Sequence, residues 1–330
     1  MRALRIAGKT ATEAEISGRV LTHDLGPDLR KGTVLGAGHL DRLRRLVEFH
    51  VAELEPSDLH EDAAAIRLAA AICGPGLEAS RPAQSQSRLV ATRRGLVRIG
   101  ARAVDALNRL GPVSVFTLVD GQAVDVGAEV AGCKVTPVAV PAAVIEEAER
   151  ISRARAPVVQ VVAFRPLRTL IVVTERLKPK ARELFLKAVT TKLGWYGAQV
   201  EAVREVARSP EAVREAYMEA AATGVELVIF AGASSIDPLD PAYEELAAVG
   251  GEVVQQGAPS HPGSMLWVGR LERAVVLGVA SCAGFGKSTS IDLLLPFVFA
   301  CGRADAEDVR RLGVGGLIES AAGRTFPPYS

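Results

Sequence analysis

Residues 231–241 combine small, hydroxyl and carboxylate side chains in the order Ala-Gly-Ala-Ser-Ser-Ile-Asp-Pro-Leu-Asp-Pro. The small residues would let a ligand approach the backbone, and the hydroxyls would donate hydrogen bonds. These candidate binding residues are Gly232, Ala233, Ser234 and Ser235. Asp237 and Asp240 are candidate catalytic carboxylates, and Asp237 is also a candidate Mg²⁺ ligand. Asp240 has an alternative role, because an Asp-Pro pair is typical of the first residues of a helix.

A second candidate segment, residues 256–263, reads Gln-Gly-Ala-Pro-Ser-His-Pro-Gly. Two prolines and two glycines predict a rigid connection between elements. Pro259 and Gly263 are candidate ligand contacts, and His261 could act as a base or a hydrogen-bond donor. The alternative is an ordinary link with an exposed histidine.

The third candidate segment, residues 281–289, lies between an apolar run and a predicted helix start near Ser288. Backbone amides at a helix N-terminus form a ready anion site, and Lys287 adds positive charge. The segment resembles a phosphate-binding P-loop, but Ser281 stands where that loop needs its first glycine. An anion or ligand site is therefore favoured over a nucleoside triphosphatase, and a plain helix start is the remaining alternative. The candidate binding residues are Ser281, Cys282, Ala283, Gly284, Lys287 and Ser288.

The elements that must position these segments alternate between strand and helix over the C-terminal half of the chain. Apolar runs at 170–173 and 227–230 are typical of strands that are buried on both faces. Amphipathic helices are predicted over 178–193 and from Ser209-Pro210 onward, and strands over 199–206 and 274–279. This alternation predicts an α/β fold with a mostly parallel sheet. Ligands in such folds bind outside the carboxyl ends of the strands, where the three segments lie.

The N-terminal half predicts a smaller, strand-rich α+β region. Helical patterns are expected over 39–49, 58–72 and 142–154, with Asp58 as the cap of the second helix and Glu61 reaching back to it. The expected organisation is an α+β region at 1–165, an α/β domain at 166–302 and a C-terminal tail at 303–330.

Composition excludes several classes of protein. The chain has 330 residues, a net charge of +1 and 48% hydrophobic residues, so it is neither disordered nor a dedicated nucleic-acid binder. Its apolar runs are too short to span a bilayer, and its first residues lack a signal-peptide core, so a cytoplasmic protein is expected. The four cysteines form no Cys-x-x-Cys pair and the histidines show no metal-ligand spacing, so no structural zinc site is expected.

The three segments, in this order, resemble the molybdopterin-binding domain shared by the molybdenum insertase and the molybdopterin adenylyltransferase. Residues 231–237 align without a gap with the family's Gly-Gly-Val-Ser-Val-Gly-Asp, and Asp237 falls on the first acid. Residues 258–263 stand at the family's Pro-Gly-Lys-Pro-like loop, and 279–284 stand at its Leu-Pro-Gly-Asn-Pro. The Ser-Cys-Ala form is similar to a divergent branch of molybdopterin-binding proteins. That branch also resembles residues 31–35 and 60–64 of the N-terminal half.

The resemblance implies a three-layer αβα fold and a ligand that is molybdopterin or its adenylylated form. Thr174 and Glu175 stand at the family's Thr-Gly-Asp-Glu-Leu, without the Gly-Asp, and Val206-Ala207-Arg208 replaces an acidic pair. Fold and pterin binding are expected to survive these departures, with Asp237 positioning Mg²⁺ or molybdate. The implied role is cofactor biosynthesis or maturation as a transferase of the molybdotransferase or adenylyltransferase type. The alternatives are a non-catalytic carrier that serves a molybdoenzyme apoprotein and, behind it, a nucleotide-processing enzyme. A homo-oligomer is expected.

Overall fold

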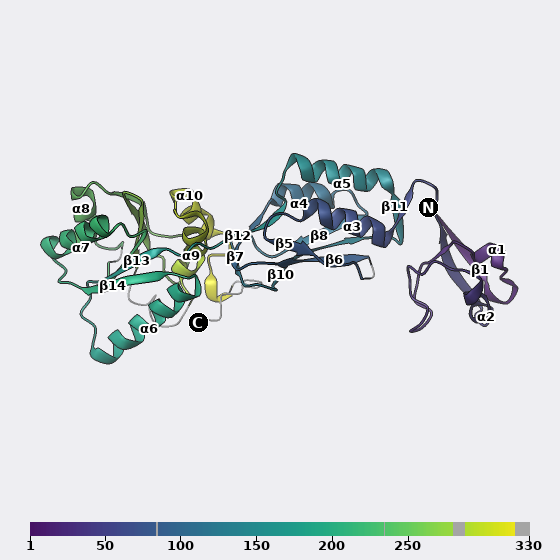
Figure 1. Ribbon diagram of the computed structural model, residues 1–330, viewed down its shortest axis with the longest axis horizontal. Helices are drawn as coiled ribbons and strands as arrows, with labels where there is room; N and C mark the ends of the chain where they lie inside the picture. The colour runs from purple at the N-terminus through teal and green to yellow at the C-terminus, as the bar shows by residue number, and fades with distance from the viewer. Residues whose placement is uncertain (84, 234, 280–287, 321–330) are drawn as a thin grey trace. The chain divides into compact units, whose positions relative to one another are not determined.

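The chain divides into two units. Unit 1 comprises Met1–Arg93, Val97–Leu118 and Val126–Val161, and unit 2 comprises Arg94–Leu96, Val119–Asp125 and Val162–Ser330. The structure is a computed structural model that describes residues 1–83, 85–233, 235–279 and 288–320 (Figure 1). Within these ranges no helix is both long enough and apolar enough to cross a bilayer.

Unit 2 is built on a six-stranded sheet of order β14-β13-β15-β18-β17-β16. The first four strands of this order are parallel to one another, and β17 pairs antiparallel with both β18 and β16. The strands are β13 (Arg168–Val173), β14 (Gln199–Glu205), β15 (Leu227–Ala231), β16 (Glu252–Gln256), β17 (Trp267–Leu271) and β18 (Ala274–Val279). The predicted α/β class with a largely parallel sheet is therefore confirmed.

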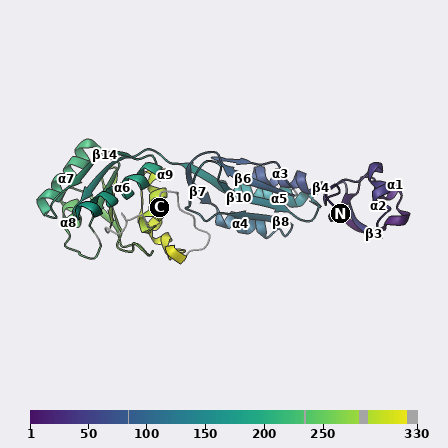
Figure 2. The same ribbon diagram turned by 90° about the horizontal axis from the view of Figure 1, so that it is seen from below.

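Helices cover both faces of this sheet (Figures 1 and 2). Ile171 packs with α6, α9 and α10 on one face, while its neighbour Val172 packs with α7 and α8 on the other. Because successive strand residues point to opposite faces, the apolar run of β13 serves both layers. The helices are α6 (Pro179–Trp195), α7 (Pro210–Thr223), α8 (Pro241–Ala248), α9 (Ser290–Cys301) and α10 (Ala306–Arg310), followed by the short 3₁₀ turns at Arg311–Gly313 and Ile318–Ser320.

Local capping chemistry decides where these helices begin and end. The Ser209 side chain accepts a hydrogen bond from the backbone N–H of Ala212 at the start of α7, and Pro210 occupies the first helical position. The helix ends at Gly224, whose φ of 64° is left-handed. The helix expected near Ser288 begins at Ser290, with Thr289 at its cap.

Unit 1 contains a four-stranded antiparallel sheet of order β5-β6-β10-β8, with α3, α4 and α5 on one side of it (Figure 1). A three-stranded sheet of order β1-β3-β2 precedes it, and β4 pairs with β11. The strands are β1 (Arg2–Ala7), β2 (Val20–Leu21), β3 (Glu48–Glu53), β4 (Asp58–His60), β5 (Leu77–Ala79), β6 (Gln86–Ala91), β8 (Val113–Thr117), β10 (Glu129–Val135) and β11 (Ala139–Pro141). The helices are α1 (Glu13–Ile16), α2 (Leu40–Leu43), α3 (Glu61–Ile72), α4 (Ala101–Asn108) and α5 (Ala142–Ala154), with 3₁₀ turns at Gly8–Thr10 and Ala37–His39. Two further strands, β7 (Gly95–Ile99) and β12 (Val159–Ala163), contain residues of both units, and β9 (Ala123–Val124) belongs to unit 2.

Two sequence predictions in unit 1 are wrong. The helix expected over 39–49 is helical only over Leu40–Leu43, because residues 48–53 pair with β1, and residues 48–51 alternate between exposed and buried positions. The helix expected over 58–72 begins three residues later, since residues 58–60 pair with β11. His60, not Asp58, caps it by accepting the backbone N–H of Asp62. The carboxylate of Asp58 accepts instead from the backbone N–H of Glu55 at 2.8 Å.

Candidate functional site

The candidate site lies at the carboxyl edge of the unit 2 sheet, where β14, β13, β15 and β18 run parallel side by side. The connections after these four strands leave from this same edge. Segment 231–240 follows β15, and residues 174–177 follow β13. The sheet order therefore brings together two segments that lie more than fifty residues apart in the sequence.

Thr174 and Gly232 join these two segments. Thr174 is buried and donates to the Ala231 carbonyl from its backbone N at 3.0 Å and from its Oγ1 at 3.2 Å. Gly232 has a φ of +94°, and a Cβ at this position would lie 2.7 Å from the Cβ of Glu175. Only glycine combines this backbone conformation with so close an approach. The segment after β13, with Thr174 and Glu175, therefore contacts the segment after β15 at Gly232, as the sequence predicted residues of both to be at the site.

Segment 231–240 also forms hydrogen bonds with residues of β17 and β18 and with Met265, which precedes β17. The Gly232 backbone N donates to the Val279 carbonyl at the end of β18, at 3.0 Å. The buried indole of Trp267 donates to the Ala233 carbonyl at 3.0 Å, and the Ser235 backbone N donates to Met265 at 3.0 Å. The segment is therefore held by hydrogen bonds to three neighbouring parts of the chain.

Asp240 has the capping role that its Asp-Pro context predicts. Its side chain is only 2% exposed, and Oδ1 accepts the backbone N–H of Ala242 at 2.9 Å at the start of α8. Its Oδ2 accepts a charge-assisted hydrogen bond from the Arg208 guanidinium. Burial and the adjacent charge of Asp240 raise the pKa of Tyr243, which keeps that phenol neutral.

Arg208 is the residue that sequence reasoning missed at this site. It follows β14, and besides Asp240 its guanidinium lies 3.8 Å from a carboxylate oxygen of Asp237. The sequence signal was the replacement of an acidic pair by Val206-Ala207-Arg208. Arg208 follows β14, while Asp237 and Asp240 follow β15. Since β13 alone separates β14 from β15 in the sheet, the guanidinium can reach both carboxylates.

Asp237 is less free than its place before Pro238 predicts. Its Oδ1 accepts the backbone N–H of Leu239 at 3.0 Å, which closes a turn, although the side chain stays 53% exposed. Since Asp240 is committed to Ala242 and Arg208, Asp237 is the accessible carboxylate of the pair. Among the described residues no three His, Cys, Asp or Glu side chains cluster as metal ligands. A cation here would take one carboxylate from Asp237 and its remaining ligands from water or from the bound substrate.

A depression of about 730 Å³ lies beside these residues, between the connections after β13 and β14. Its charged lining comprises Glu175, Arg176, Glu205 and Arg208. Glu205 is paired with Arg182 of α6. The depression therefore presents two arginines and two glutamates at the edge of the sheet. The arginines could bind an anionic group of a ligand, and the carboxylates could accept hydrogen bonds from its polar groups.

The second predicted segment packs against the start of α9. Ser260 is buried, and its Oγ donates to the Ser290 Oγ at 2.7 Å. A Cβ on Gly263, whose φ is +107°, would lie 2.7 Å from the Ser290 backbone N. His261 donates its backbone N–H to Gly316 at 2.7 Å, while its side chain is exposed. The described part of the fold thus anchors His261 by its backbone, and Pro259 packs near Gly313 and Gly316.

The start of α9 is itself held by a buried ion pair that the sequence did not reveal. Lys192 of α6 donates from Nζ to Asp292 Oδ2 at 2.8 Å, and both side chains are almost fully buried. The same oxygen accepts the backbone N–H of Thr289 at 2.7 Å. Ser288, a predicted binding residue, is half-buried immediately before this cap. The other predicted residues of the third segment, Ser281, Cys282, Ala283, Gly284 and Lys287, lie outside the described residues, as does Ser234.

Comparisons with known proteins complete the description. No protein-family model and no curated protein matches the chain. Among solved structures it is similar to a molybdopterin biosynthesis MoeA protein from Pyrococcus horikoshii, with 16% identity, 74% of this chain and 80% of that chain covered, and a TM-score of 0.30. It is also similar to the molybdopterin biosynthesis enzyme MoaB from Thermus thermophilus, with 14% identity, coverage of 40% and 91%, and a TM-score of 0.30. A molybdopterin biosynthesis Mog protein from Mycobacterium ulcerans is 15% identical, with coverage of 41% and 95% and a TM-score of 0.28. The function proposed below therefore rests on the chain's own residues.

Proposed function

We propose that this chain binds molybdopterin or its adenylylated form at the carboxyl edge of the unit 2 sheet and acts in molybdenum-cofactor biosynthesis or maturation. One observation carries the proposal: the segment that resembles the family's ligand loop, 231–237, directly contacts Thr174 and Glu175 after the neighbouring strand. The loops at 174–175 and 231–237, which the resemblance assigns to one ligand, are thus in contact with each other.

The residues present fit a pterin ligand in part. Gly232 leaves room for close approach to the backbone, and Ser235 supplies a half-buried hydroxyl. The mixed charges of the neighbouring depression suit a phosphate that is balanced by bases. The fit to Mg²⁺ is weaker, because Asp237 is the one accessible carboxylate of the described pair.

A carrier role is the second candidate, and the Arg208–Asp240 ion pair specifically favours it. Arg208 replaces a metal as the countercharge of both acids, so the ligand could be held without a divalent cation. A carrier would deliver finished cofactor to a molybdoenzyme apoprotein. A transferase would need Asp237 to hold a Mg²⁺ ion that neutralises the negative charge of the phosphate during molybdate insertion or adenylyl transfer.

The proposed binding is tested by purifying the chain from a host that makes molybdopterin and detecting bound pterin by fluorescence after oxidation. We expect substoichiometric pterin and no flavin or nicotinamide. A titration that shows no affinity for any molybdopterin form would overturn the proposal.

The choice between carrier and transferase rests on molybdate-dependent conversion of adenylylated molybdopterin by the purified protein. A carrier gives no turnover, and its pterin affinity does not require Mg²⁺. In Arg208→Gln the acids lose their countercharge, so affinity should fall without Mg²⁺ and recover when Mg²⁺ is added. Arg168→Gln is the matched control, since Arg168 pairs with Glu201 at the opposite end of β13 and is similarly exposed.

The nucleotide-processing alternative is tested at Lys287. Lys287→Ala should weaken binding of the pterin phosphate, while both forms lack ATP hydrolysis because Ser281 stands at the P-loop glycine position. Robust ATPase activity that disappears in Lys287→Ala would reverse this ranking.

A further inference from the structure

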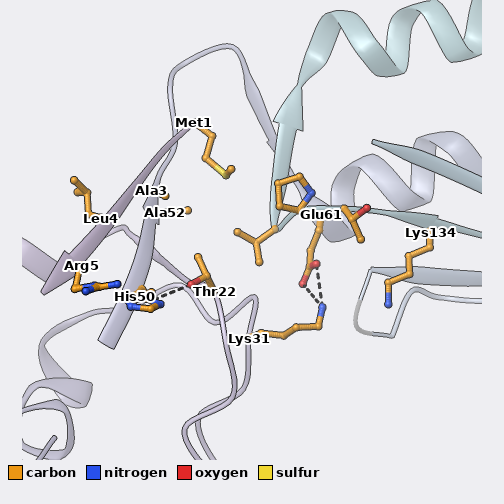
Figure 3. Close-up of a pocket in the computed structure, with 13 residues that line it drawn as sticks. Met1, Ala3, Leu4, Arg5, Thr22, Lys31, His50, Ala52, Glu61 and Lys134 are labelled. Atoms are coloured by element: carbon orange, nitrogen blue, oxygen red, sulfur yellow. Dashed lines mark hydrogen bonds and ion pairs between the residues drawn. The ribbon is translucent and has the colours of Figure 1, made fainter. Parts of the chain in front are cut away.

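A cavity of about 610 Å³ in unit 1 belongs to no part of the site described above (Figure 3). One wall is the three-stranded sheet, where Arg5 of β1 and His50 of β3 are cross-strand partners. The other wall is the start of α3 with Glu61 and the end of β10 with Lys134. In Figure 3, Lys31 extends from the first wall and its ammonium group reaches Glu61.

Cationic side chains outnumber acidic ones on the walls of this cavity. Among the described residues that line it, Arg5, Lys31 and Lys134 are cationic, while Glu61 is the one acid; Arg5 lies 3.6 Å from Glu48, an acid outside the lining. Glu61 lies 3.3 Å and 3.5 Å from the Lys31 ammonium, which has three N–H donors, so donors remain for another acceptor. No carboxylate of the described residues forms an ion pair with Lys134. Since Arg5 pairs with Glu48 and Lys31 with Glu61, the charge of Lys134 is the one on these walls that no described acid neutralises.

The position of Lys31 is built into the fold. Glu61 is only 3% exposed, and its carboxylate packs so closely on Gly32 that a Cβ there would collide with it. Gly32 has a φ of +82°, and its carbonyl lies 2.8 Å from His60 Nε2 at the cap of α3. A buried carboxylate needs a cationic partner, so Glu61 holds the Lys31 ammonium at the cavity.

The rest of the lining is mostly apolar, with Thr22, His50 and Thr136 as its polar members. Ala3, Leu4 and Ala52 come from the three-stranded sheet, and Pro137 and Val138 follow β10. Pockets for small molecules have this composition: a mostly apolar wall and a few convergent charged groups that set orientation. The cavity volume also lies within the range of such pockets.

We propose that this cavity binds a small organic anion, with its carboxylate or phosphate held by Lys31 and Lys134 and its apolar body against Ala3, Leu4 and Pro137. The anion supplies the countercharge that Lys134 lacks among the described residues. This site is in unit 1, so it is independent of the pterin site proposed for unit 2.

The experiment titrates the full ¹⁵N-labelled chain with phenyl phosphate, benzoate and the neutral analogue phenol, and follows amide shifts by NMR. We expect saturable shifts confined to β1, β3, the start of α3 and the end of β10 for one or both anions, and none for phenol. The relative affinities of phenyl phosphate and benzoate identify the preferred head group. Binding should weaken as salt is raised.

Two variants and one control test the residues. Lys134→Gln should weaken anion binding roughly tenfold, as expected for loss of a charged hydrogen-bond donor. Ala3→Trp places a large side chain at an exposed position of the lining and should abolish binding without disturbing the core. Lys9→Gln removes the same charge from an exposed residue outside the lining and should bind as the parent does. No saturable shift for either anion, equal binding of phenol, or unchanged affinity in both variants would overturn the proposal.

Discussion

Replacing Asp240 by alanine should destabilise unit 2 by about 1–2 kcal/mol. The lost N-cap hydrogen bond to Ala242 costs about 1 kcal/mol. The lost ion pair adds up to roughly 1 kcal/mol, because Arg208 is 44% exposed and can turn to solvent. The matched variant Asp240→Asn keeps the cap and loses only the charge, so it should cost less than about 1 kcal/mol.

Asp237 should behave in the opposite way. Asp237→Asn can keep the turn to Leu239, and its half-exposed side chain contributes little to stability. It removes the accessible carboxylate, so ligand or metal affinity should fall while stability stays within about 0.5 kcal/mol.

Tryptophan fluorescence reports these changes in unit 2 selectively, because both tryptophans, Trp195 and Trp267, lie there. In thermal melts of a unit this size, Asp240→Ala should lower the Tm by about 2–8 °C. Pterin titrations on the same variants separate binding from stability. If Asp240→Ala keeps its Tm but loses binding, while Asp237→Asn binds normally, the two roles have been assigned in reverse.

Three further predictions concern other parts of the fold. Gly232→Ala should destabilise unit 2 by at least about 1 kcal/mol and weaken ligand binding, since the added Cβ meets Glu175 and the left-handed backbone disfavours alanine; melts and titrations with wild-type affinity would contradict this. Lys192→Met should cost about 3–5 kcal/mol by leaving the buried Asp292 carboxylate without its base, and a urea melt followed by tryptophan fluorescence measures it. Burial raises the pKa of Cys133 from 9.0 to about 12. The unfolded chain therefore loses the thiol proton at a lower pH than the folded protein, and the free energy of unfolding should fall as pH rises from about 9 towards 12. A urea melt at each pH measures this fall, and Cys133→Ala should flatten it.

Much of unit 2 could be predicted from the sequence because its signals are local. The apolar runs at 170–173 and 227–230 became central parallel strands, since each has helices on both faces to bury its side chains. Ser209-Pro210 and Asp240-Pro241 begin helices as predicted, because a cap involves only backbone groups within three residues.

Unit 1 shows where such local signals fail. The apolar spacing of residues 39–49 suits a helix, yet residues 48–53 form β3 because they pair with β1, from Ala7↔Glu48 to Arg2↔Glu53. Asp58 has a good capping side chain, but pairing with β11 extends the backbone there and moves the cap to His60. In both places a tertiary partner outweighs the local preference.

The sequence by itself determined the α/β class of unit 2, the caps of α7 and α8, and the position of segment 231–240 directly after a buried strand. Only the tertiary structure decided which charges meet: Arg208 with Asp240, Lys192 with Asp292, and Lys31 with Glu61. The partners in these pairs are 30 to 100 residues apart. Each pair depends on which elements become neighbours, and that order is set by how the apolar faces of the whole unit are buried together.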